Sequence, residues 1–150
     1  MATPGQSILD KIAQLLASDV GGLGAAAAPK VFLVKSAFTP GPALLIANLT
    51  KAAFVGSGSK SPTAGVQLSF NDTVTGGRVV QLVEPAGGWH WEATTAVGLP
   101  ETIYGYYIAD SGDGVLYGSA LLPAPVVISQ IKDAVDIPFV RFTVIPGALV

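Results

Sequence analysis

Apolar residues recur with two different spacings along the chain, and the change between them falls near residue 30. Between residues 4 and 17 the spacing is helical, because apolar side chains return every three or four positions and form one stripe. The residues of this stripe are Ile8, Leu9, Ile12, Leu15 and Leu16. Thr3 can cap such a helix, and Pro4 suits its first turn. The pattern therefore predicts one N-terminal amphipathic helix.

The segment after this helix, SDVGGLGAAAAPK, is rich in glycine and alanine and predicts a flexible tether that ends near Pro29. An isolated helix this short is marginal in water, so its apolar stripe needs a partner. Two alternatives stay open: the stripe packs on the protein's own domain, or it binds a neighbouring subunit. We expect residues 1–29 to form an arm and residues 30–150 to form one separate domain.

From residue 30 onward, short apolar or alternating runs separated by glycine and proline predict β-strands. The runs are KVFLVK, AGVQLSF, GRVVQLVEP, GWHWEATT, ETIYGYYIAD, GVLYGSALL, PVVISQ and IPFVRFTVI. The stretch LLIANLTKAAF is expected to be a short helical or irregular crossover. Short strands with frequent turns indicate a mainly β fold, namely an antiparallel β-sandwich or a jelly roll.

The acidic, glycine-rich stretch Asp110–Gly114 lies between two of these runs. It does not fit a calcium loop of the EF-hand type, because glycines occupy two of the ligand positions and no glutamate follows. Aspartate, serine and glycine are turn formers that tolerate positive φ. The sequence therefore predicts a hairpin tip between strands at Ile103–Ala109 and Val115–Leu122.

Charged residues make up only 12% of the chain, against about 25% in ordinary soluble domains. Hydrophobic residues make up 50%, and the mean hydropathy is +0.56. No apolar run reaches the roughly 18 residues that span a bilayer, and the eight basic residues are scattered singly, so we expect neither a membrane nor a nucleic-acid partner. Such a chain is expected to bury part of its apolar surface in contacts with other subunits. A monomer rich in alanine and glycine is the alternative.

Candidate chemistry is sparse. The chain has one histidine, His90, and no cysteine, so the usual zinc ligand sets cannot form. In a strand, Trp89 and Trp91 would share one face while His90 and Glu92 share the other. The two tryptophans could stack on a sugar ligand, or they could fill the core, which is the commoner use. We expect no enzyme activity, no cofactor and no metal.

Three acidic residues, Glu84, Glu92 and Glu101, lie near predicted strand ends at roughly equal steps. A pair of carboxylates at the right separation could serve glycoside hydrolysis. Exposed acids in loops are much commoner than such pairs, and we expect these three to be exposed.

Three stretches together point to a family: KVFLVKSAFTPGPALLIANLTKAAFVG, LPETIYGYYIADSGDGVLYGSALLPAPVVIS and IPFVRFTVI. They resemble small β-rich virion structural proteins of tailed bacteriophages, of the capsid cement or decoration type. The resemblance covers most of residues 30–145, and none of its motifs is a catalytic fingerprint.

This resemblance implies a protein that stabilises the phage head by binding across shell subunits. It implies the major capsid protein or other virion proteins as partners, a homo-oligomer such as a trimer, and a place in the virion after assembly in the host cytoplasm. The N-terminal arm would then bind a neighbour. The alternative is a tail or fibre component that acts as a receptor- or glycan-binding module. Sparse charge and a tethered apolar helix independently suit an assembling subunit.

Overall fold

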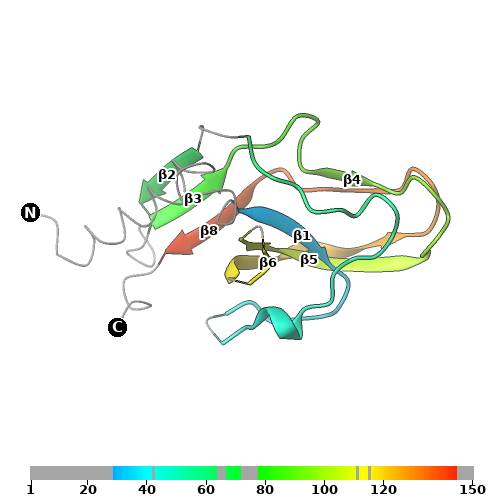
Figure 1. Cartoon of the computed structure of the whole chain (residues 1–150), viewed down its shortest axis with the longest axis horizontal. Coiled ribbons are helices and arrows are strands. Elements are labelled where there is room, and N and C mark those ends of the chain that lie inside the picture. The colour runs from blue at the N-terminus through cyan, green and yellow to red at the C-terminus, as the bar shows by residue number, and fades with distance from the viewer. Residues whose placement is uncertain are drawn as a thin grey trace, which may run out of the picture.

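The computed structural model describes residues 29–41, 43–63, 67–71, 78–110, 112–114 and 116–144. Within these residues, eight β-strands form three small antiparallel sheets, and the helical structure is one 3-10 turn, η1 (Ile46–Asn48) (Figure 1). This confirms a mainly β chain. The predicted N-terminal helix lies outside the described residues, as do the residues of its stripe, Ile8, Leu9, Ile12, Leu15 and Leu16.

The β5 sheet contains β1 (Lys30–Val34), β5 (Glu101–Ala109) and β6 (Leu116–Ile128), with β5 in the middle. Directly paired residues share a face, so Val31 and Ile108 point to one side of the sheet. Phe32 and Tyr107 point to the other side. Every residue of β5 is buried or half-buried, because both faces of this central strand are covered.

Two smaller sheets complete the fold. The β3 sheet has the order β2 (Gln67–Asn71), β3 (Arg78–Leu82) and β8 (Val140–Val144). The third sheet pairs β4 (His90–Glu92) with β7 (Ala134–Asp136). The three sheets share one main core, since its buried members come from all of them: Val31, Leu33, Ile108 and Ile128, then Leu82 and Val140, then Trp91 and Val135.

The far face of the β5 sheet is covered by the segment that follows β1, drawn in cyan below the sheet in Figure 1. Here Phe38 lies over Gly105, so closely that a Cβ at Gly105 would stand 2.9 Å from the Phe38 ring. A second apolar cluster forms between this segment and the sheet, from Phe32, Val34, Phe38, Ile46, Leu49, Tyr107, Ala109 and Leu116. The expected irregular crossover thus includes η1, and it packs against one face of the β5 sheet.

The strand boundaries differ from the sequence prediction in one important way. GVLYGSALL and PVVISQ were predicted as separate strands, but both contribute to the long strand β6. The pairing with β5 jumps from Leu121 to Val126, so Pro123 and Pro125 lie in a bulge. Proline is tolerated there because the bulged residues need no ladder hydrogen bond.

Candidate functional site

Trp89 and Trp91, the candidates for ligand stacking, lie in the main core and are 2% and 1% exposed. Their ring centroids are 6.3 Å apart, as the predicted alternation along β4 requires. The Trp91 Nε1–H donates to the carbonyl oxygen of Gly58 at 2.8 Å, which satisfies the one polar atom of that ring. In this structure the two rings fill the core and present no open face to a sugar.

His90 lies on the opposite face of β4, between two carboxylates. Its Nδ1 is 2.6 Å from Oδ1 of Asp136, and its Nε2 is 3.7 Å from Oε2 of Glu92. The β4–β7 pairing places His90 directly opposite Asp136, a contact across 46 positions that the sequence alone did not reveal. All three side chains are exposed. Among the described residues, no group of three His, Cys, Asp or Glu is placed to hold a metal ion.

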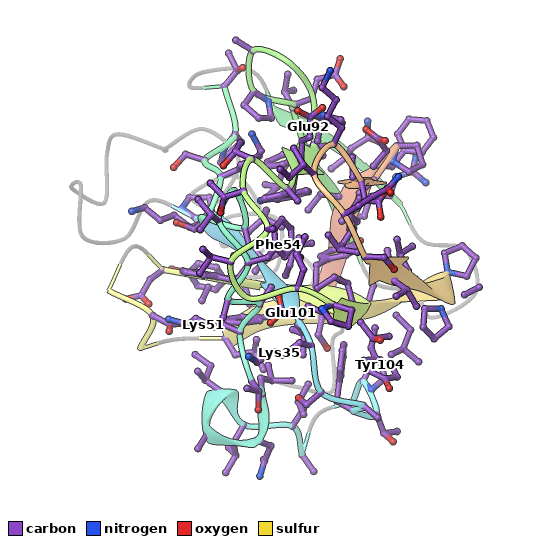
Figure 2. All side chains as sticks on the ribbon, turned by 90° about the vertical axis from the view of Figure 1, so that its right-hand side faces the viewer. Lys35, Lys51, Phe54, Glu92, Glu101 and Tyr104 are labelled. Atoms are coloured by element: carbon purple, nitrogen blue, oxygen red, sulfur yellow. The ribbon has the colours of Figure 1, made fainter. Side chains whose placement is uncertain are left out.

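Glu101, at the start of β5, is the buried carboxylate of the structure, with only 8% of its surface exposed. Its Oε2 accepts the backbone N–H groups of Ala53 and Phe54 at 2.9 and 3.1 Å. Its Oε1 lies 3.1 Å from Nζ of Lys35. Figure 2 shows Glu101 between Lys35 and the segment that carries Phe54. The expectation of an exposed loop acid is wrong for this residue, because its carboxylate fastens that segment to the sheet.

The hairpin tip at Asp110–Gly114 is confirmed as a turn between β5 and β6. The Gly114 N–H donates to Oδ1 of Asp110 at 2.6 Å, and the Asp113 N–H donates to the Asp110 carbonyl oxygen at 3.0 Å. Asp113 adopts a φ of 57°, the left-handed conformation that aspartate tolerates in turns. The side chain of Asp110 therefore shapes the turn.

Asp113 also connects the tip to the body of the sheet. Its Oδ1 accepts the Tyr107 hydroxyl at 2.8 Å, and its Oδ2 forms an ion pair with Lys51. The Lys51 amino group also lies 4.8 Å from the ring centroid of Phe32, which stacks on Tyr107. Burial raises the pKa of Tyr107 far above its usual value, and the hydrogen bond and negative charge of Asp113 raise it further. The Tyr107 phenol is therefore a neutral donor at ordinary pH.

The contacts of Glu101 and Asp113 thus hold the fold together, while several large hydrophobic side chains are exposed. Large hydrophobic side chains with 43% to 70% of their surface exposed are Leu45, Val55, Val97, Leu121, Val127, Ile131 and Phe139. A shallow depression of about 400 Å³ has a lining that contains no charged residue: Ala37, Phe38, Thr39, Pro40, Gly41, Ala43, Leu44 and Asn48. A surface of this kind suits protein contacts better than chemistry.

Comparison with protein-family models, with curated proteins and with solved structures finds no match. No helix among the described residues is long and apolar enough to cross a membrane.

Proposed function

We propose that this protein is a structural virion protein of the capsid cement or decoration type, which stabilises a phage head by binding across shell subunits. The observation that carries the proposal is the set of exposed apolar side chains on a chain with only 12% charged residues. Single exposed hydrophobic residues are ordinary, but so many on a small, charge-poor chain favour a surface that is covered in an assembly.

The protein would bind the shell through many weak contacts that act together. Removing apolar surface from water contributes about 25 cal/mol per Å², so each contact of one or two side chains is weak. A capsid repeats the same binding surface many times, and an oligomeric cement protein engages several copies at once. The second contact then becomes intramolecular, and the overall affinity rises without stronger single contacts.

The finer architecture belongs to the same proposal. An antiparallel β-sandwich or jelly roll is supported by the main core, to which all three sheets contribute buried residues. Such a core would present its loops and strand edges as rigid contact surfaces. Residues 1–29 would act as the arm, with the stripe Ile8, Leu9, Ile12, Leu15 and Leu16 on a neighbouring protein.

The direct test is sedimentation of the purified chain with empty shells of the phage that encodes it. We expect saturable binding by the full chain, and an affinity at least about tenfold lower for residues 30–150 alone, because the arm contacts are lost. The mass of each form in solution is measured in parallel by light scattering. A stable monomer that leaves the shells unbound in both forms would contradict the proposal.

A further inference from the structure

The outer edge of β6 is an unusual strand edge. In the order β1-β5-β6, one side of β6 pairs with β5, and no strand of the described part of the chain forms a ladder with its other side. The thirteen residues of β6, LYGSALLPAPVVI, contain no Asp, Glu, Lys or Arg. Exposed edges in soluble proteins usually carry a charge, above all a lysine, or are very short, because a bare edge pairs with other strands.

The opposite edge of the same sheet is closed. On the outer side of β1, Val31 and Lys60 exchange backbone hydrogen bonds of 2.8 and 3.0 Å. The Ala52 N–H donates to the carbonyl oxygen of Leu33 at 2.9 Å. Among the described residues, one edge of the β5 sheet is therefore covered by the chain's own loop, while the other edge has no partner strand.

The part of β6 that can accept a strand is Leu116–Leu122. The bulge with Pro123 and Pro125 interrupts the edge beyond it, since proline has no N–H to donate. Before the bulge the edge carries neither proline nor charge. Leu121 is 48% exposed and pairs with Gly105, beside the ring of Phe38, so an apolar side chain accompanies the open backbone.

We propose that Leu116–Leu122 pairs antiparallel with the same segment of a second copy of this chain, about a two-fold axis at Ser119. An antiparallel strand pair is self-complementary under a two-fold rotation, so one open edge is enough for a closed dimer. In such a pair, the residue on the axis faces its own copy, and residues equally far before and after it face each other. A charged residue on or near the axis would therefore lie close to the same charge in the second copy, which is destabilising. β6 has no charge to oppose. The two β5 sheets would join into the order β1-β5-β6-β6-β5-β1.

The partner is therefore a second copy, and this specifies the homo-oligomer that the proposed function leaves open. The inference rests on the proposed function only for the expectation of self-association. It requires an even number of subunits, so the trimer that the family resemblance implies would overturn it.

The first experiment uses the absence of cysteine from the chain. In the proposed register, Ser119 faces its own copy and Tyr117 faces Leu121. We expect Ser119→Cys to form a disulfide-linked dimer under mild oxidation, at least about tenfold faster than the exposed loop control Val97→Cys, because opposite Cα atoms lie within disulfide range. Leu121→Cys should link to Tyr117→Cys in a mixture and only slowly to itself. Equal rates at Ser119 and Val97 would overturn the pairing.

The second experiment introduces a charge at the two-fold axis, and it distinguishes loss of self-pairing from misfolding. Light scattering should give the unmodified protein twice the chain mass of 15.2 kDa, or an even multiple of that mass. Ser119→Lys and Ser119→Glu should each be monomeric, because like charges meet at the axis, whereas their equimolar mixture should restore the dimer. Val97→Lys serves as the matched control and should stay dimeric.

Three results would overturn the proposal: a monomer or trimer of the unmodified chain, a dimer of Ser119→Lys alone, or no recovery in the mixture. Shell binding is measured on the same samples. A monomer that binds shells would contradict the β6 pairing and leave the proposed function unaffected. A dimer that does not bind shells would contradict the proposed function and support the β6 pairing.

Discussion

The two sides of the β5 sheet use polar groups in opposite ways. On the β1 side, Glu101 and Asp113 both hold the segment after Thr50 on the sheet, through backbone N–H groups and Lys51 respectively. Glu101 also forms an ion pair with Lys35, just after β1. On the β6 side the strand carries no charge, and its edge has no partner strand among the described residues. A chain with few charges thus places several of them in internal contacts. The strand left open to other molecules, β6, is accordingly uncharged.

The largest effect on stability should come from removing the carboxylate of Glu101, which holds the neighbouring segment on the β1 side of the sheet. In Glu101→Ala, the N–H groups of Ala53 and Phe54 and the amino group of Lys35 lose a buried partner. We expect the free energy of unfolding to fall by about 3 kcal/mol, which lowers the melting temperature by roughly 6–12 °C for a chain of this size. Urea unfolding followed by tryptophan fluorescence measures it.

Glu92→Ala is the matched control, because its carboxylate is exposed. It should change the free energy of unfolding by no more than about 0.5 kcal/mol. If the two variants lose equal stability, Glu101 does not fasten the loop in the way its contacts indicate.

These contacts also show where sequence reasoning succeeds and where it stops. The alternation through Trp89, His90 and Trp91 and the turn at Asp110–Gly114 were predictable, because strand period and turn chemistry are local. The burial of Glu101 was not, since its partners are backbone groups 47 and 48 positions away.

Two further misses concern strand limits. The strand β7 (Ala134–Asp136) has only three residues, too few to establish a period. The continuity of β6 across Pro123 and Pro125 was missed because proline ordinarily ends a strand, and an edge position removes that restriction.

The next effect concerns alkaline pH, which should weaken the β5 sheet through tyrosines of β5 and β6. Burial raises the pKa values of Tyr106, Tyr107 and Tyr117, and the charge of Asp113 adds to the effect at Tyr107. The unfolded chain loses these protons near the ordinary tyrosine pKa of about 10, whereas the folded chain holds them to higher pH. The stability is therefore complete below about pH 10 and decreases above it, by at most about 1.4 kcal/mol per pH unit for each tyrosine.

Urea midpoints at a series of pH values between about 8 and 11 measure this loss. Asp113→Asn should bring the pKa of Tyr107 in the folded protein closer to its ordinary value, because the variant removes the negative charge that disfavours the tyrosinate while burial remains. Alkaline titration of the folded variant and of the unmodified protein, followed by the ultraviolet absorbance of tyrosinate, measures this change. Identical titration curves for the two proteins would show that Asp113 does not act on Tyr107.

The smallest effect should come from Val127→Thr on β6, compared with the same isosteric change at Val31 on β1. Val31 is fully buried in the main core, whereas Val127 is 54% exposed. A buried hydroxyl without a partner costs about 1–3 kcal/mol, so Val31→Thr should shift the urea midpoint clearly. Val127→Thr should change the free energy of unfolding by less than about 0.5 kcal/mol. Both variants are measured at micromolar and at tenfold higher concentration, because stability gained by association depends on concentration. Equal losses in the two variants would mean that Val127 is as covered in solution as Val31, and the contrast between the two sides of the sheet would fail.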